Sequence, residues 1–139
     1  MSRRLGEFEI IERIKASFGK PSDSLIMGIG DDCAITSVNP GFQLLSTIDA
    51  LVEDVHYRRS YISPEQLGHK AMAVNLSDIA AMGGIPRHAF ISLCIPDDVD
   101  QDYLERFYRG MCVLASAHGT VVAGGNISKS IKGFNAIEL

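Results

Sequence analysis

Apolar residues recur every three or four positions near the start of the chain and predict an amphipathic helix over residues 7–18. Phe8, Ile11, Ile14 and Phe18 form its apolar stripe, and charged residues fill most positions between them. A glycine and a proline follow within three residues. Because proline disfavours helix in the residue before it and glycine suits a C-terminal turn, the helix is expected to end there.

Several start signals agree on a second helix. Ser63 is a favoured N-cap, Pro64 suits the first helical position, and Gln66 completes a capping box. The helix is expected to run to Met82 and to stop at the two glycines that follow. Its second half is apolar nearly all round, which is typical of a helix buried in the middle of its domain.

Runs of β-compatible residues predict strands around these helices. They cover residues 25–27, 33–37, 42–52, 88–95, 120–123 and 134–139. A further apolar stripe, from Tyr103 to Ala115, predicts a third amphipathic helix that ends at His118 and Gly119. The strands at 42–52 and 88–95 carry more apolar residues than three helices on one face of a small sheet would cover. An exposed sheet face of this kind favours pairing with a second copy.

Composition agrees with one globular domain spanning residues 1–139. The chain is 46% hydrophobic, and 13 Lys and Arg residues face 17 Asp and Glu residues, for a net charge of −4. Mild acidity argues against nucleic acid as the main partner, and the absence of a long apolar run argues against a membrane span or a secretory leader. Three widely spaced cysteines, interpreted with the methionines as core residues, favour a reducing cytoplasm.

Asp78 is the first residue with a candidate chemical role. It shares the second helix with Asn75, and these two are the only strongly polar groups in an otherwise apolar stretch. A buried carboxylate costs several kcal/mol unless it is paired, hydrogen-bonded or bound to a cation. Asp78 therefore either caps backbone amides of a neighbouring loop or binds a metal ion.

Two further acidic segments could join Asp78. Gly28-Ile29-Gly30-Asp31-Asp32 is either a plain turn or a flexible loop with oxygen ligands for Mg²⁺, and it matches neither standard glycine-rich nucleotide loop. Asp49 follows Thr47 at the end of an apolar stretch. If Asp32, Asp49 and Asp78 converge, their mutual repulsion requires a divalent cation between them. Such a site suits phosphoryl transfer and hydrolysis alike.

Two more positions allow a functional and an ordinary interpretation. His56 has either a binding role or a surface or capping role. Gly124-Gly125-Asn126 is expected where a strand ends, with Ser128 and Lys129 just beyond. Its backbone amides either hold phosphate oxygens or form a simple turn.

Four segments in order along the chain resemble one enzyme family. They are Gly6-Glu7-Phe8, Gly28-Ile29-Gly30-Asp31-Asp32-Cys33-Ala34, residues 47–57 (TIDALVEDVHY) and residues 68–83 (GHKAMAVNLSDIAAMG). Together they resemble thiamine-monophosphate kinase, a member of the superfamily of aminoimidazole ribonucleotide synthetase and selenophosphate synthetase. The stretch from Lys70 to Gly83 is similar to the superfamily signature, whereas the Glu-Phe start and the Leu-Val-Glu-x-Val-His segment are specific to the kinase.

The resemblance implies an enzyme that uses ATP to phosphorylate thiamine monophosphate to thiamine diphosphate, by direct transfer with several Mg²⁺ ions. Positioning and charge neutralisation then supply the catalysis, and no catalytic side chain is assigned beyond them. The metal ligands that it implies are Asp32, Thr47, Asp49, Asp78 and Asn126. The nucleotide-binding residues are Gly30, Asp31, Tyr108, Gly124 and Gly125, and His56 is a substrate-binding residue.

The resemblance also implies an α+β fold, with a small mixed or antiparallel sheet and helices on one face, that pairs with a second copy into a dimeric barrel. Family members have a C-terminal domain that this chain lacks, so the chain corresponds to their N-terminal ATP- and Mg-binding domain and is expected to be inactive alone. Ile48 and Asn126 depart from the family, which usually has Thr and Asp there. The alternatives are a hydrogenase-maturation member of the superfamily and a non-catalytic binding or dimerisation module.

Overall fold

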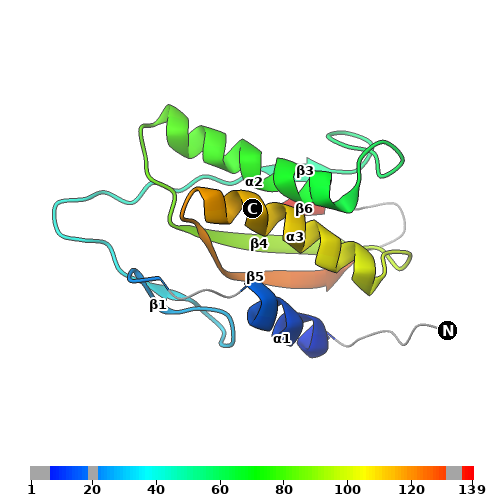
Figure 1. Cartoon of the computed structure of the whole chain (residues 1–139), viewed down its shortest axis with the longest axis horizontal. Helices are drawn as coiled ribbons and strands as arrows, with labels where there is room; N and C mark the ends of the chain where they lie inside the picture. The colour runs from blue at the N-terminus through cyan, green and yellow to red at the C-terminus, as the bar shows by residue number, and fades with distance from the viewer. Residues whose placement is uncertain (1–6, 19–21, 131–135) are drawn as a thin grey trace.

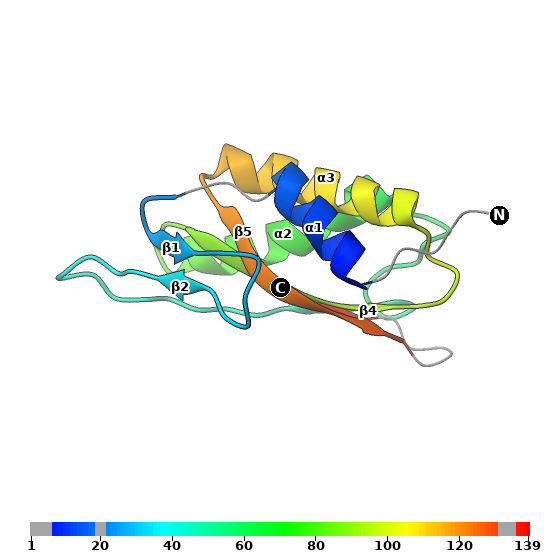
Figure 2. The ribbon, with the colours of Figure 1, turned by 90° about the horizontal axis from the view of Figure 1, so that it is seen from below.

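The computed structural model describes residues 7–18, 22–130 and 136–139 as a mixed α/β chain. Three helices lie on one face of a four-stranded sheet whose strand order is β3-β6-β4-β5, and a separate two-stranded sheet, β1-β2, lies beside it (Figures 1 and 2). The elements are α1 (Glu7–Phe18), β1 (Leu25–Met27), β2 (Ile35–Thr36), β3 (Ala50–Val52), α2 (Pro64–Ala81), β4 (His88–Ile95), α3 (Gln101–Ala117), β5 (Val121–Lys129) and β6 (Ala136–Glu138).

The elements with strong local signals agree with the sequence. The ranges of α1, β1 and β4 are as expected. Helix α2 begins with the expected capping box, in which Ser63 Oγ accepts from the Gln66 amide and Gln66 Oε1 accepts from the Ser63 amide. Helix α3 starts at Gln101, slightly before its apolar stripe, because the Asp100 carboxylate caps the amide of Tyr103. None of the described helices is long and apolar enough to cross a membrane.

The core lies between the helices and the sheet. Helices α2 and α3 pack closely against each other, and their fully buried side chains include Leu67, Met72, Phe107 and Met111. Two glycines make this approach possible. A Cβ on Gly68 would meet the Phe107 carbonyl oxygen, and one on Gly110 would meet the Glu65 carbonyl oxygen. The bidentate ion pair between Arg106 and Glu65 joins the same two helices.

Two expected strands are shorter in the structure. Only Ile35–Thr36 of the expected 33–37 strand and Ala50–Val52 of the expected 42–52 strand pair with another strand. Residues 42–49 form no ladder, and Phe42, Leu44 and Ile48 are 70% or more exposed. A strand requires a partner along its length, and within the described part of the chain only the last residue of this segment, Asp49, bonds to the backbone of a distant segment, at Leu139.

The prediction of a strand end at Gly124 was wrong, because β5 continues through Gly124, Gly125 and Asn126 to Lys129. Parallel pairing with β4, from His88↔Val121 to Ile95↔Lys129, holds this extension in the sheet. Gly125 permits it, since a Cβ there would meet the Ile91 carbonyl oxygen of the neighbouring strand. The last expected strand, 134–139, is observed as Ala136–Glu138, and its first two residues lie outside the described ones.

The expectation that α2 is buried on all sides was also wrong. Most of its buried residues lie in the N-terminal half, and Asn75 is the one buried residue of the C-terminal half. Beyond that point Asp78 is exposed and Met82, at the C-cap, is 73% exposed. The sheet and α3 cover only one side of this half, so an apolar sequence alone did not decide its burial.

Candidate functional site

Asp78 is hydrogen-bonded to a residue from a distant part of the chain. The Thr47 hydroxyl donates to Asp78 Oδ2 over 2.8 Å, which joins the extended segment before β3 to the exposed side of α2. Asp78 thus needs no compensation for burial, and the argument that it is a buried carboxylate does not hold. What the structure does support is a pair of oxygen donors, one carboxylate and one hydroxyl, of the hard type that Mg²⁺ prefers.

Asp49 lies two residues after Thr47 and is held by its backbone. Its amide donates to the Leu139 carbonyl, and its carbonyl accepts from the Leu139 amide, each over 3.2 Å. Its side chain remains half-buried next to the end of β6. Thr47, Asp49 and Asp78 therefore approach one edge of the sheet, the edge formed by β3.

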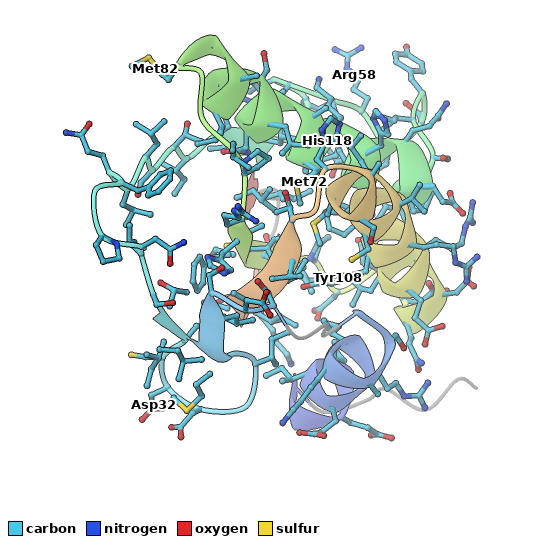
Figure 3. All side chains as sticks on the ribbon, turned by 60° about the vertical axis from the view of Figure 1, so that its left-hand side comes forward. Asp32, Arg58, Met72, Met82, Tyr108 and His118 are labelled. Carbon is cyan, nitrogen blue, oxygen red and sulfur yellow. The ribbon has the colours of Figure 1, made fainter. Side chains whose placement is uncertain are left out.

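The expected cluster of Asp32, Asp49 and Asp78 does not form within one chain. In residues 7–18, 22–130 and 136–139, no three side chains of His, Cys, Asp or Glu gather closely enough to hold a metal ion. Asp32 lies exposed in the loop of the β1-β2 hairpin, far from Met82 at the end of α2 (Figure 3). The hairpin belongs to a separate sheet, and its position is set by contacts that the sequence pattern does not reveal.

The loop containing Gly30 and Asp31 lies instead beside β5. A Cβ on Gly28 would lie 3.7 Å from the Ala123 carbonyl oxygen, one residue before Gly124. Gly30 has a φ of +133°, and the Lys15 ammonium of α1 packs against it. The two glycine-containing segments that the sequence singled out are thus neighbours, with a cation beside one of them. Exposed backbone and an ammonium group are suited to an anion.

Hydrogen bonds hold this region in place. Ser24 Oγ and His88 Nε2 lie 3.1 Å apart and connect the hairpin to the start of β4. Burial, with Arg87 adjacent, lowers the pKa of His88 and favours the neutral ring. Within the loop, the Asp32 backbone amide donates to Asp31 Oδ1, and in β5 the Asn126 side-chain Nδ2 donates to Ser128 Oγ over 2.9 Å.

His56 lies exposed on a tight turn after β3. The Val52 amide donates to His56 Nδ1 over 3.0 Å, and the Lys70 ammonium donates to the His56 carbonyl. Because a backbone N–H can only donate, Nδ1 is the acceptor, and the neutral ring carries its hydrogen on Nε2. The imidazole therefore presents an N–H donor on the surface.

Tyr108, expected beside the nucleotide, is buried in the core. It is 3% exposed, and its ring packs edge-on against Phe107 at a centroid distance of 5.7 Å. Burial raises the pKa of its hydroxyl well above the ordinary range. The apolar stripe of α3 accounts for this position, so a nucleotide contact by Tyr108 stays a prediction.

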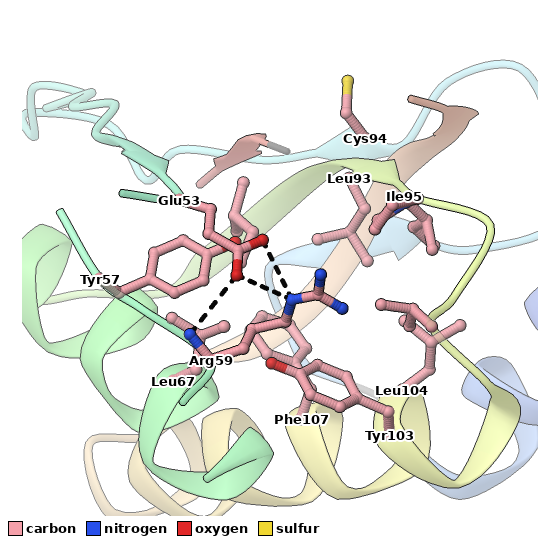
Figure 4. A pocket seen from close by; sticks show the side chains of 13 residues that line it. Glu53, Tyr57, Arg59, Leu67, Leu93, Cys94, Ile95, Tyr103, Leu104 and Phe107 are labelled. Carbon is pink, nitrogen blue, oxygen red and sulfur yellow. Dashed lines mark hydrogen bonds and ion pairs between the residues drawn. The ribbon is translucent and has the colours of Figure 1, made fainter. Parts of the chain in front are cut away.

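The sequence missed a charged cluster near His56. Arg59 Nε donates to both carboxylate oxygens of Glu53, over 2.9 and 3.0 Å (Figure 4). The Arg59 Nη2 lies 3.0 Å from Asp98 Oδ2. Arg58 and Arg59 are adjacent and identical in type, so no spacing rule shows which one turns inward. The signal in the sequence was the basic pair Arg58-Arg59 close to Glu53 and Asp54, which indicates ion pairs in this segment.

The family of the chain follows from comparison with known proteins. The family model described as AIR synthase related protein, N-terminal domain, matches residues 30–137, and the chain belongs to this family. The thiamine-monophosphate kinase of Aquifex aeolicus is 46% identical over 130 residues, which are 94% of this chain and 40% of that protein. The chain spans about 40% of the length of the curated relatives that it matches.

Solved structures agree with this assignment. Thiamine-monophosphate kinase from Stenotrophomonas maltophilia has 34% identity and a TM-score of 0.79 over 96% of this chain and 40% of that one. AaThiL complexed with AMPPCP and TMP has 42% identity and a TM-score of 0.65, and the match covers 99% of this chain and 43% of that chain. E. coli HypE shares only the fold, with 18% identity and a TM-score of 0.71, and the match covers 96% of this chain and 42% of that chain. Family and relatives are as the sequence resemblance implied.

Proposed function

We propose that the protein containing this chain transfers a phosphoryl group from ATP to thiamine monophosphate. The observation that carries the proposal is the likeness of 99% of the chain, at 42% identity, to AaThiL complexed with AMPPCP and TMP. AMPPCP is an ATP analogue, so that complex pairs an ATP-like molecule with TMP. HypE supports no competing function, because its likeness is one of fold alone.

In this proposal the neighbouring segments around Gly30 and Gly124 bind the nucleotide phosphates. Gly30, Gly124 and Gly125 have no side chain to cover their backbone, Asp31 follows Gly30 directly, and Lys15 adds positive charge beside Gly30. Backbone N–H groups and an ammonium stabilise phosphate oxygens without covalent chemistry. Tyr108 keeps its proposed place near the nucleotide as part of the core behind these segments.

The proposed metal ligands are Asp32, Thr47, Asp49, Asp78 and Asn126. Their donor atoms are all oxygens, which fits Mg²⁺, and Mg²⁺ is usually held by one or two carboxylates together with substrate phosphates and water. A site for Mg²⁺ therefore does not need three clustered carboxylates, and none are clustered within the described residues. In this proposal the ligands act in separate parts of the site, with Thr47 and Asp78 together and Asp32 in the β1-β2 loop. Bound Mg²⁺ would neutralise the charge that develops on the phosphoryl oxygens. His56 would donate its Nε2–H to thiamine monophosphate.

The function is tested by measuring ADP formation from ATP, thiamine monophosphate and MgCl₂. The full-length protein is expected to turn over, and the isolated 139-residue chain is expected to show negligible activity, because orienting groups supply much of the rate and relatives are longer. The full-length protein with thiamine in place of thiamine monophosphate is the matched control. Robust turnover by the isolated chain would contradict the expectation that groups outside these 139 residues are needed for the reaction. An inactive full-length protein would contradict the proposed activity.

We further propose that the chain forms a homodimer through the face of the sheet opposite the helices. Phe42, Leu44 and Ile48 in the segment before β3, and Phe90 of β4, are large apolar side chains exposed to solvent. Burying them in a symmetric dimer would allow the segment before β3, which forms no ladder within the described chain, to pair with a second copy and close the sheets into a barrel.

The chain alone is expected to sediment as a dimer at micromolar concentration. Obligate interfaces of this kind typically bury on the order of 2,000 Å² or more, so the dimer should persist on dilution. Replacing Phe42 and Leu44 by Asp should yield monomers, whereas Val113→Asp, on the exposed side of α3, should not. A monodisperse wild-type monomer would refute the barrel.

A further inference from the structure

The turn that carries His56 has an unusual backbone conformation. Asp54 has a φ of +63°, in the left-handed region that non-glycine residues seldom adopt. The turn is closed by the Asp54 amide donating to the Tyr57 carbonyl over 2.7 Å and the His56 amide donating to the Val52 carbonyl over 2.8 Å. These bonds shape the turn internally, but they do not determine where it lies on the protein.

Packing beneath the turn is incomplete. A pocket of about 40 Å³ lies between the turn and the junction of β4 with α3 (Figure 4). Leu93, Ile95, Val99 and Phe107 are among its mostly apolar walls. The Tyr103 hydroxyl, which also lines the pocket, is buried with no hydrogen-bond partner in the described chain. Close packing therefore does not hold the turn against the body of the protein at this point.

Arg59 spans the gap. Its Nε–H is shared between the two carboxylate oxygens of Glu53, at the start of the turn, and its Nη2 reaches Asp98 in the loop between β4 and α3. The Arg59 and Glu53 side chains are only 27% and 17% exposed, so solvent screens this pair less than a surface pair. The hydrogen bond from Arg59 also lowers the pKa of Asp98, as expected for a charge-assisted contact. Arg58, by contrast, pairs with Asp54 on the outside, at 55% and 80% exposure.

We propose that Arg59 is a positioning residue that fixes the His56 turn against the β4-α3 loop and thereby sets where the imidazole meets the substrate. The role in substrate binding rests on the proposed function, whereas the role in ordering the turn does not. Arg59 acts through its contacts with Glu53 and Asp98. Bridging Glu53 through Nε and Asp98 through Nη2 requires an arginine, because a lysine presents one point charge without separate donors on a planar group.

Amide hydrogen exchange of the 139-residue chain tests the ordering role directly. In Arg59→Met the Asp54 and His56 amides are expected to exchange at least about fivefold faster, while amides of α3 are unchanged. Arg58→Met is the matched control, since it removes the same charge from the neighbouring residue, and it should leave these amides as in wild type. Asp98→Asn keeps the contact between Arg59 and Glu53, so it should increase the exchange rates of these two amides by less. This variant replaces Arg59→Met in the test if Arg59→Met does not fold. Unchanged exchange in Arg59→Met, or an equal change in Arg58→Met, would overturn the proposal.

Steady-state kinetics of the full-length protein test the consequence for substrate. Arg59→Met should raise KM for thiamine monophosphate by about tenfold and leave KM for ATP within about twofold, because a small displacement of one orienting group affects one ligand. Arg59→Lys should lie between wild type and Arg59→Met. Equal changes in both KM values would indicate a merely structural role. If the wild-type protein fails to phosphorylate thiamine monophosphate, the proposed function fails, and the exchange experiment still decides the ordering role.

Discussion

Replacing Asp78 by Asn in the full-length protein is expected to lower kcat for thiamine diphosphate formation on the order of 100-fold or more, with little loss of stability. The side chain is exposed and accepts a hydrogen bond from Thr47, so the amide can remain in place without a packing defect. What the substitution removes is a negative charge that we propose binds Mg²⁺. The measurement is steady-state turnover at saturating ATP and MgCl₂, with thermal unfolding of the same samples.

Asp102→Asn is the matched control for this experiment. Asp102 is also an exposed helical carboxylate, 76% exposed and 3.8 Å from Arg106, but it lies on α3 away from the proposed ligands. Its loss should change neither turnover nor unfolding appreciably. Parallel losses of activity and stability in Asp78→Asn would assign Asp78 a structural role, and unchanged turnover would remove it from the proposed metal site.

Gly68→Ala is expected to destabilise the fold by at least about 3 kcal/mol, because the new methyl group meets the backbone of α3. The Phe107 carbonyl oxygen lies in its place and the Met111 amide nitrogen would be 2.9 Å away. Backbone atoms cannot rotate out of the way as a side chain can, so the two helices must separate. Gly110→Ala, which meets the Glu65 carbonyl, should behave in the same way. The free energy of unfolding is measured by urea denaturation.

The sign of this effect is diagnostic. Helix propensity alone favours alanine over glycine by about 1 kcal/mol in a helix interior, so an exposed glycine replaced by alanine would gain stability. Ser77→Ala, at an exposed position of α2, provides the baseline and should change stability by less than about 0.5 kcal/mol. A gain of stability in Gly68→Ala would mean that α2 and α3 are farther apart than the structure shows.

The candidate site could be predicted from sequence only in part. The residue types around Asp31, Asp78 and Gly124 indicated phosphate and metal chemistry, and the family resemblance was correct. The prediction of one carboxylate cluster failed, because it assumed contacts between segments more than fifteen residues apart along the chain. Arg59 was missed for a related reason, since its inward orientation depends on where Asp98 lies, thirty-nine residues later.

Local signals determined the helices and the best strands. The apolar stripe in α1, the capping box at Ser63 and the run of β-compatible residues in β4 each lie within one short stretch of sequence, and each element forms where its signal predicts it. Gly83, with a φ of +68°, follows α2 as the sequence indicated. In a local hydrogen bond or side-chain contact, both partners lie within the same short stretch of sequence. Elements that depend on such interactions can therefore be predicted without tertiary information.

Tertiary structure alone decided pairing, burial and orientation. Residues 42–49 have the composition of a strand but form none within the described chain, whereas the glycines of β5 continue a strand because β4 lies beside them. Asp78 is exposed on an apolar helix, and Arg59 turns inward while Arg58 does not. Each outcome depends on a partner from a distant segment. The free energy of a backbone hydrogen bond, a buried surface or an ion pair exists only when both members are in place, and a single stretch of sequence contains only one of them.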